Sequence, residues 1–443
     1  ETCGSRSSSG SHTCAHARSD GRSSRGHHIV IRCLESRQRA DLTYRHNLEH
    51  GRHGWLRLTP AYSVRVVDQV LAEFGMGAKT VFEPFSGTGT TPLCAGYRGL
   101  DAFATDINPF LIWLGRVKAA RYRVSQQIEL LAAVEAIAEL LREGKATAAP
   151  LPPLANIERW WHRAELDFVT RLRGEVELAA TGPVRDLLKV AFCRTMIALS
   201  NAAFNHQSMS FKAPEATNQI RLPMEVAENA FVSQFLSDGR VVADAMLDNP
   251  KGSIRIEKSD ARSLGLVGSQ DGQFDLLITS PPYPNRMSYI RELRPYMYWL
   301  GFLGEAKEAG ELDWEAIGGT WGIATSRLLS WAPSGAFVPR SLLPTIERIR
   351  LGHPKNGPLM AQYVHKYFDD MFHHFEAAAK RVKLGGTAHY IVGNATFYGH
   401  LVPAERLYCD QLKKAGFKSA EARAIRKRNS KKELVEFHVI AQR

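Results

Sequence analysis

The sequence has few cysteines and no long apolar run. Its 443 residues hold six cysteines, whose spacing matches no disulfide framework. This excludes a small disulfide-stapled domain and makes the reducing cytoplasm the expected compartment. No apolar stretch approaches the ~18 residues that cross a bilayer, and the N-terminus has no apolar signal core. We therefore expect no membrane partner.

The N-terminal end lacks aliphatic side chains. Residues 1–28 are rich in Ser, Gly, Arg and His, so we expect residues 1–50 to form a largely disordered basic tail. Four side chains in this tail are of types that bind zinc: Cys3, His12, Cys14 and His16. Their spacing matches no standard zinc finger, and no metal site is expected.

The rest of the composition is that of a globular protein with an acidic partner. Apolar residues make up 44% of the chain, the net charge is +12 and the pI is near 9.4. The length suits two or three domains, or one domain with large insertions. The positive charge favours nucleic acid as the partner.

A strand–turn–helix–strand pattern follows the tail. We expect a strand over 80–85, a Gly/Thr turn over 86–91, a helix over 92–99 and a strand over 101–106 that ends in an acid. This βαβ order is typical of a site for a nucleotide-like cofactor.

The turn has a particular ligand chemistry. Gly87 and Gly89 allow close approach to the backbone, and Asp106 is placed to accept hydrogen bonds from ribose hydroxyls. The dinucleotide fingerprint GxGxxG is absent. Glu83 just before the turn would repel a pyrophosphate but would hold an ammonium. A ligand with an ammonium, a carboxylate and a ribose is S-adenosylmethionine.

A second stretch, ITSPPYPN (278–285), follows the apolar run FDLLI. Pro281 and Pro282 cannot donate to a sheet, and each fixes φ near −65°. The pattern therefore predicts the end of a strand with a stiff, extended tip beyond it. A plain surface loop is the alternative.

Together the two stretches resemble a known family. VFEPFSGTGTT (81–91) resembles the cofactor motif, and TSPPY (279–283) the catalytic motif, of DNA amino-methyltransferases, which methylate cytosine N4 or adenine N6. The resemblance covers roughly 53–110 and 255–443, with Glu83 where the family usually has Asp. It implies an α/β fold, the Rossmann-like doubly wound sheet of a class I methyltransferase dependent on S-adenosylmethionine, with helical and loop-rich insertions.

The resemblance also implies roles for the tip. Ser280 Oγ and the Pro281 carbonyl would accept hydrogen bonds from the amino group of a flipped-out base, Pro282 would stiffen the tip, and Tyr283 would stack on the base. No cysteine follows the prolines, so direct in-line methyl transfer is expected rather than a covalent intermediate.

The cofactor site implied by the resemblance is larger than the turn. Its expected members are Glu83, Pro84, Phe85, Ser86, Gly87, Gly89, Thr90, Thr91 and Asp106. The segment 253–265 resembles the acidic turn that holds the adenine amine, which adds Asp260. Ser63, in a predicted helix over 59–75, is either a contact of the methionine carboxylate or an ordinary helix cap.

Two insertions divide the expected catalytic domain, which comprises 51–110 and 251–443. We expect a helical insertion over 111–250 and a loop-rich one over 301–362, the latter serving target recognition or forming a lid or dimer surface. Later in the chain we expect a strand over 385–394 and a closing hairpin over 422–443.

Polar and aromatic side chains in these regions are further candidates. Trp160 and Trp161, beside Arg159 and Arg163, either meet bases and phosphates or lie in the core. A polar run faces DNA or caps the cofactor: Arg194, Asn201, His206 and Ser208. Over 286–302 we expect aromatic side chains inward and basic ones toward phosphate or partner acids: Arg286, Arg291 and Arg294.

The target base is the last expectation. In the family a Ser opening the motif goes more often with cytosine N4, so we expect N4 methylation of cytosine in double-stranded DNA. The alternatives are adenine N6, guanine N2 in RNA, and a non-catalytic subunit that binds S-adenosylmethionine. A cognate restriction endonuclease is a further candidate partner.

Overall fold

The computed structural model describes residues 39–58, 61–203, 210–212, 224–265, 272–320, 323–428 and 433–443. The candidate zinc ligands of the tail lie outside this part of the chain, as do His206 and Ser208. Among the described residues, no three metal-binding side chains cluster, and no helix has the length and apolar character needed to cross a bilayer.

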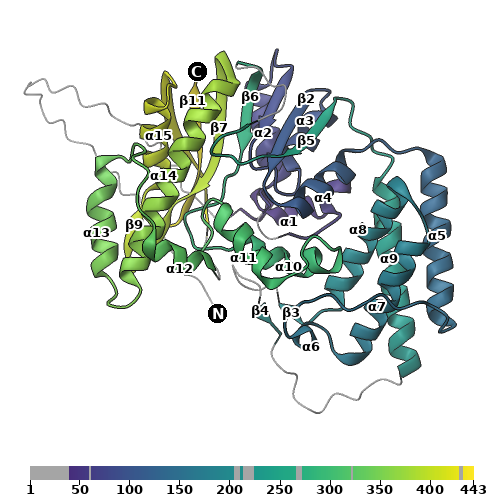
Figure 1. Cartoon of the computed structure of the whole chain (residues 1–443). Coiled ribbons are helices and arrows are strands. Elements are labelled where there is room, and N and C mark those ends of the chain that lie inside the picture. Colours follow the sequence, from purple (N-terminus) through teal and green to yellow (C-terminus); the bar gives the residue numbers. More distant parts are fainter. Residues whose placement is uncertain are drawn as a thin grey trace, which may run out of the picture.

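The core is a seven-stranded sheet with the order β10-β11-β7-β6-β1-β2-β5 (Figure 1). The strands from β7 to β5 are parallel, and β11 runs antiparallel to both of its neighbours. The strands are β1 (Thr80–Glu83), β2 (Asp101–Asp106), β5 (Ile254–Lys258), β6 (Phe274–Thr279), β7 (Val382–Gly393), β10 (Ser419–Lys427) and β11 (Val435–Gln442). The predicted doubly wound α/β fold is confirmed, as are the strand over 385–394 and the closing hairpin.

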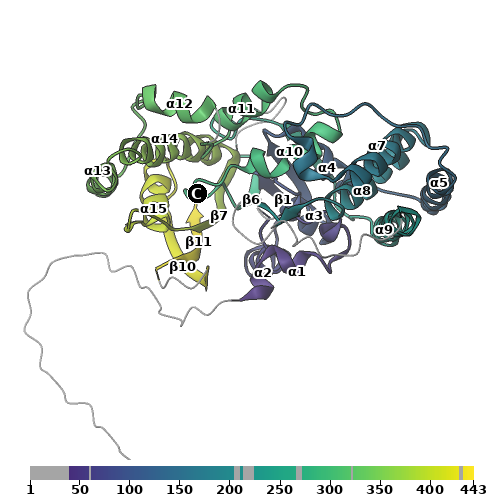
Figure 2. The same ribbon diagram turned by 90° about the horizontal axis from the view of Figure 1, so that it is seen from below.

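Helices cover both faces of this sheet (Figures 1 and 2). Successive side chains of the central strand β1 point to opposite faces of the sheet: Val81 packs in one core cluster and Phe82 in the other. One layer holds α2 (Val64–Phe74), α3 (Thr90–Tyr97) and α4 (Pro109–Ala119), and the other α14 (Gly357–Arg381) and α15 (Ala404–Lys414).

The sheet brings three strand ends together. Parallel strands β6, β1 and β2 are neighbours, so Thr279, Glu83 and Asp106 end at the same edge of the sheet. From β1 the chain continues to β2 and β5 on one side, whereas β6 and β7 lie on the other side of β1. Ligands of open α/β sheets bind at the point where the strand order reverses in this way. The predicted turn and the predicted tip both leave from this edge.

The segment between β2 and β5 is largely helical and stands beside the sheet, at the right of Figure 1. It comprises α5 (Val124–Arg142), α6 (Ile157–Trp160), α7 (Arg163–Leu178), α8 (Gly182–Ala198), α9 (Met224–Ala245) and the short pair β3 (Ala202–Ala203) and β4 (Ser210–Phe211). Trp160 and Trp161 are buried in the same core cluster as these helices. Of the two interpretations of these tryptophans, the core one is confirmed.

Residues 301–362 are mostly helical, which corrects the expected loop-rich insertion. The segment forms α11 (Ala306–Glu315), α12 (Ile323–Ser330), η3 (Arg340–Leu342), α13 (Leu343–Leu351) and the start of α14. Some of its Gly and Pro residues lie at helix ends: Pro344 is in the first turn of α13 and Gly352 follows its last residue. Pro at the start and Gly at the end of a helix are both compatible with helix formation.

The end of the expected tail is ordered, which is a second correction. Residues 39–54 form η1 (Ala40–Leu42), α1 (Tyr44–Asn47) and η2 (Gly51–Gly54). Leu42 packs against Val66 of α2 and Ile391 of β7. The remaining elements are α10 (Tyr289–Trp299), directly after the tip, and the hairpin β8 (Ala395–Phe397) and β9 (His400–Val402).

Candidate active site

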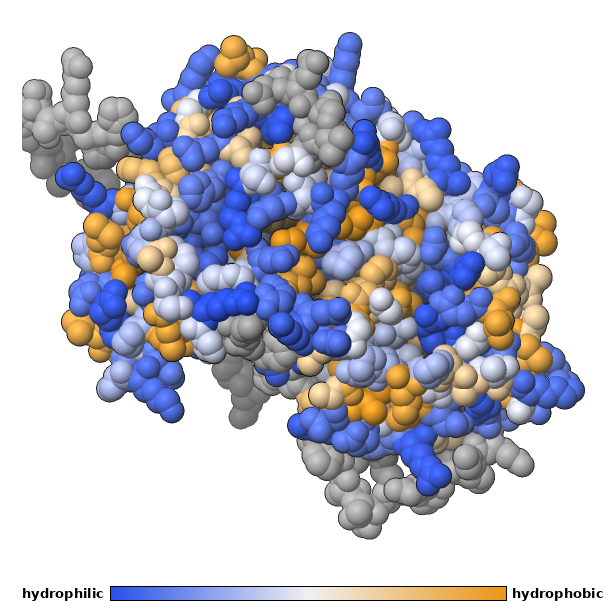
Figure 3. Space-filling model, viewed as in Figure 1, coloured by the Kyte–Doolittle hydropathy of each residue, from blue (hydrophilic) through white to orange (hydrophobic). Residues whose placement is uncertain are grey.

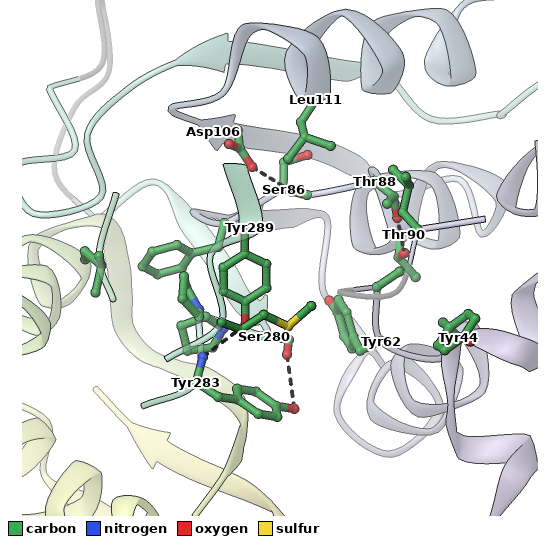
Figure 4. Close-up of a pocket in the computed structure, with 18 of the residues that line it drawn as sticks. Tyr44, Tyr62, Ser86, Thr88, Thr90, Asp106, Leu111, Ser280, Tyr283 and Tyr289 are labelled. Atoms are coloured by element: carbon green, nitrogen blue, oxygen red, sulfur yellow. Dashed lines mark hydrogen bonds between the residues drawn. The ribbon is translucent and has the colours of Figure 1, made fainter. Parts of the chain in front are cut away.

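A single cavity of about 860 Å³ lies at the edge where the strands end. Figure 4 shows its two walls: Ser86, Thr88, Thr90 and Asp106 belong to the turn and the strand beside it, and Ser280, Tyr283 and Tyr289 to the tip and the helix after it. Of the predicted site residues it is lined by Pro84, Phe85, Ser86, Gly87, Thr90, Asp106, Asp260, Ser280, Pro281, Pro282 and Tyr283. The structure therefore joins the two stretches, which are about 190 residues apart in sequence.

The glycine turn is held by Asp106. The backbone N–H of Gly87 donates to Asp106 Oδ2 at 2.8 Å, and that of Asn108 donates to Oδ1 at 2.9 Å. Gly87 and Gly89 have φ of 51° and 78°, which side-chain-bearing residues rarely adopt. Burial raises the pKa of Asp106 to about 6, although these backbone bonds act against the shift. Each carboxylate oxygen keeps a lone pair for a further donor.

The turn also carries an unpaired polar atom. Ser86 Oγ is buried and has no hydrogen-bond partner among the described residues, although the residue lines the cavity. A buried hydroxyl without a partner is costly, so this position fits a polar ligand group. Behind the turn, Lys118 Nζ donates to the Thr88 carbonyl at 3.2 Å, and burial lowers its pKa to about 7.

Glu83 lies behind the cavity wall. Its Oε2 accepts hydrogen bonds from the hydroxyls of Tyr62 and Thr91, at 2.9 Å and 2.7 Å. Its Oε1 accepts from the Thr279 hydroxyl and from the Phe85 N–H. Burial raises its pKa to about 8, against the effect of these donors. The carboxylate thus ties together the start of α3, the end of β6 and the segment before α2, and Tyr62, not Glu83, lines the cavity.

Three other predicted cofactor residues do not line the cavity. Ser63 is fully buried, caps α2 by accepting from Arg65 N–H, and donates to the Asp41 carbonyl. Of its two interpretations, the helix cap matches this geometry. Gly89 and Thr91 lie at the start of α3, one residue to each side of the cavity-lining Thr90. They shape the turn instead of facing a ligand.

Asp260 does line the cavity, beside Ser259 and Ala261. Arg262 donates to it through Nε and a terminal nitrogen, the latter at 2.8 Å. Burial alone would raise the pKa of Asp260, but the hydrogen bonds and charge of Arg262 bring it below the ordinary value. The carboxylate is therefore a fixed acceptor at this end of the cavity.

The tip is fixed by tyrosine hydroxyls. Tyr367 donates to the Pro282 carbonyl at 2.7 Å, and Tyr289 accepts from the Tyr283 N–H at 3.3 Å. Tyr363 accepts from the N–H of Arg286, whose φ of 62° turns the chain back toward α10. These contacts come from α10 and α14, so the extended backbone is held by two helices in addition to its own prolines.

Ser280 and Tyr283 point toward one another (Figure 4). Ser280 Oγ donates to the Ile391 carbonyl at 3.2 Å and to Tyr283 Oη at 3.4 Å. Its proton is therefore directed away from the cavity, and its lone pairs remain as acceptors. One face of the Tyr283 ring is covered by Arg428, whose guanidinium carbon lies 5.1 Å from the ring centroid. Tyr283 also lines the cavity, so a base would stack on the ring face away from Arg428.

Several residues that line the cavity were not among the predicted site residues. Tyr62, Arg428 and Glu436 line the cavity, as does the segment from Arg39 to Arg45. Tyr62 lies next to Ser63 and was within reach of sequence reasoning. Glu436 and Arg428 belong to the closing hairpin, whose position over the tip follows only from the pairing of β11 with β7.

The cationic candidates separate into two groups. Arg286 and Arg291 are exposed beside the tip, whereas Arg294 is partly buried. Arg194 instead pairs with Asp238 at 2.8 Å and donates to backbone carbonyls of residues 54 and 55. Among the described residues, Arg194 therefore stabilises the packing of the insertion. This corrects the expectation that its side chain faces DNA. Asn201 hydrogen-bonds backbone of the same insertion.

The surface around the site is mixed. Hydrophilic side chains cover most of the face in Figure 3, and hydrophobic ones gather toward its middle. The exposed arginines beside the tip suit contact with phosphate groups.

Two curated proteins are similar to this chain. The Type II methyltransferase M.BsoBI of Geobacillus stearothermophilus is 21% identical over 460 residues, which cover 94% of this chain and 88% of that protein. The Type II methyltransferase M.MvaI of Kocuria varians is 22% identical over 260 residues, 54% of this chain and 55% of that protein. This chain is a distant homologue of methyltransferases.

Other comparisons add little. No family model matches the chain. Two structures of the rRNA methyltransferase aviRa from Streptomyces viridochromogenes align with 90% of this chain at 10% and 11% identity, with TM-scores of 0.27 and 0.26. The strand order of the seven-stranded sheet, and not this likeness, establishes the fold.

Proposed function

We propose that this protein is a DNA methyltransferase that uses S-adenosylmethionine to methylate the exocyclic N4 of a flipped-out cytosine. The observation that carries the proposal is the shared cavity: the glycine turn lines one wall and the Ser280–Tyr283 tip the other. The distant likeness to two Type II methyltransferases supports the same reaction and substrate class.

The residues of the turn fit the cofactor. When bound, S-adenosylmethionine supplies a methyl group activated on a sulfonium. Asp106 has free lone pairs for ribose hydroxyls, and the unpaired Ser86 hydroxyl offers a polar contact. Asp260 is an acceptor for an adenine amine. We expected Glu83 to contact the ammonium group of the cofactor. In this proposal Tyr62 makes that contact, because it stands between the Glu83 carboxylate and the cavity.

The residues of the tip fit an amino group. Ser280 Oγ has its one proton shared between the Ile391 carbonyl and Tyr283 Oη, so it accepts one N–H of the base. The Pro281 carbonyl has no donor among the described residues and accepts the other. Two acceptors draw both protons away from the nitrogen lone pair and hold it for in-line attack. The open face of Tyr283 stacks on the base, which contributes ~1–3 kcal/mol.

The product identifies the reaction. Purified protein is incubated with labelled S-adenosylmethionine and unmethylated DNA, then with RNA, and the nucleosides are released and identified by mass spectrometry. We expect N4-methylcytosine from DNA. N6-methyladenine would keep the mechanism and correct the base. Label in RNA alone, or cofactor binding without transfer, would contradict the proposal.

Cofactor affinity should depend on pH through Asp106. Its pKa of about 6 in the free protein means that it is charged above pH 6 and neutral below. A carboxylate accepts ribose hydroxyls better than a protonated acid does, so affinity is full above this pH and is lost as the pH falls through it. We expect the dissociation constant to rise about tenfold from pH 7 to pH 5 in titration calorimetry. Asp106→Asn should bind weakly and lose this dependence; an unchanged slope in that variant would contradict the assignment.

A further inference from the structure

A chain of hydrogen bonds leads from Ser280 to a buried carboxylate. Ser280 Oγ donates to Tyr283 Oη at 3.4 Å, and Tyr283 Oη donates to Glu436 Oε1 at 2.8 Å. Glu436 is 5% exposed and lies in β11. Arg426 of the neighbouring β10 donates to both of its oxygens, at 2.8 Å and 3.1 Å. The carboxylate is therefore fixed in place and aligned on the tyrosine hydroxyl.

Methylation of an amino group creates a need for a proton acceptor. The nitrogen that gains a methyl group must lose a proton, and a neutral serine hydroxyl takes one up only if it passes its own onward. The Ile391 carbonyl, the other partner of Ser280, is an amide oxygen and a very weak base. Burial raises the pKa of Tyr283, so its phenol stays protonated and acts as a donor. Beyond Tyr283 the first group that can hold a proton is Glu436.

Resting on the proposed function, we propose that Glu436 is the final acceptor of the proton released on methylation, through Ser280 and Tyr283. The N–CH₃ bond forms as the C–S bond breaks, and the N–H electron pair stays on nitrogen. The nitrogen's proton passes to Ser280 Oγ, the serine proton to Tyr283 Oη, and the phenolic proton to Glu436. The charge of the carboxylate is neutralised in this step and restored when the proton leaves through the cavity, which Glu436 lines. Glu436 touches no substrate atom and acts through the other two side chains.

Other charged and titratable groups surround this chain. Arg426 contacts Glu436 directly, Arg428 covers one face of Tyr283, and Tyr289 accepts its backbone N–H. His438 lies two residues further along β11. Substitution of Glu436 itself is therefore needed to separate its role from those of these neighbours.

The first test separates the ring of Tyr283 from its hydroxyl. Tyr283→Phe keeps the stacking face and breaks the chain. We expect its single-turnover rate of methyl transfer to fall by about 100-fold, with KM for DNA and the dissociation constant for S-adenosylmethionine within about twofold of wild type. Tyr283→Ala should lose the same rate and also bind DNA more weakly. Tyr398→Phe, a tyrosine of the β8–β9 hairpin, is the control.

The second test separates the charge of Glu436 from its shape. Glu436→Gln should lower the single-turnover rate by about 100-fold, with KM for DNA and the dissociation constant for S-adenosylmethionine within about twofold of wild type, and Glu436→Asp, which keeps a carboxylate, should recover part of the rate. Glu421→Gln, an exposed glutamate of the same hairpin that pairs with Arg423, should keep the wild-type rate. Thermal unfolding and DNA affinity, measured alongside, confirm that the Gln variant is folded.

The outcomes distinguish this inference from the proposed function. A full-rate Tyr283→Phe or Glu436→Gln variant would overturn the proton route, while methylation of DNA by the wild type would still support the proposed function. A wild-type protein that methylates no DNA would overturn both. Slow Tyr283→Phe and Glu436→Gln variants with normal DNA affinity, together with partial recovery in Glu436→Asp, support the route.

Discussion

Replacing Ser280 with alanine is expected to lower the single-turnover rate of methyl transfer by about 10²- to 10³-fold, the usual cost of removing one well-placed polar contact from a reacting group. The hydroxyl contacts the Ile391 carbonyl and Tyr283 and borders the cavity. Its loss removes one acceptor for the amino group and breaks the proton route, while the fold loses only one partly buried hydroxyl. Rapid-quench measurements with labelled cofactor would give the rate.

The control for this variant is Ser233→Ala. Ser233 is exposed on α9 in the helical insertion and bonds only within its own helix. It should retain the wild-type rate. If Ser280→Ala transferred methyl groups as fast as the control, the assignment of Ser280 as an acceptor would be wrong. Calorimetry should show unchanged affinity for S-adenosylmethionine, because the residue belongs to the opposite wall of the cavity.

Replacing Asp106 with alanine is expected to remove most of the affinity for S-adenosylmethionine. Two hydrogen bonds from ribose hydroxyls to a carboxylate are lost, which together are worth about 3 kcal/mol, or ~100-fold in the dissociation constant. The variant also leaves the N–H groups of Gly87 and Asn108 without their acceptor, which loosens the turn. Titration calorimetry gives the constant directly, without DNA.

Asp101→Ala provides the matched control. Asp101 opens the same strand, is exposed, and accepts from the Ser253 N–H at 2.9 Å, far from the carboxyl end of β2. It should bind the cofactor as wild type does. Equal affinities for Asp101→Ala and Asp106→Ala would refute the ribose assignment.

Sequence reasoning located the parts of the site that have a local signature. The glycine turn requires φ above zero at Gly87 and Gly89, and the apolar run before each motif forms a buried strand. Both signals span only a few neighbouring residues, so they can be recognised from the sequence alone. The parallel arrangement of β1 and β6 then accounts for the meeting of the turn with the tip.

The parts that were missed depend on contacts between distant segments. In the sequence, Glu436 is one acidic residue in a predicted strand. Only the antiparallel pairing of β11 with β7, in which Glu436 lies opposite Gly393, places it over the tip. Leu42 lies in a polar stretch, and its burial comes from Val66 and Ile391. Several Gly and Pro residues of 301–362 stand at helix ends, where they are as common as in loops, so composition alone does not distinguish the two.

The helical insertion shares its hydrophobic core with α10, the helix that follows the tip. Trp299 packs on Trp161 with ring centroids 5.7 Å apart, and Tyr296 stacks on Phe110 of α4 at 5.3 Å. The insertion is therefore no detachable module: excising it would strip one side of α10 and leave large aromatic rings in water. Heat or denaturant that unfolds the helical insertion would also release the tip in the same cooperative step. Loss of activity and unfolding of the insertion should therefore share one midpoint.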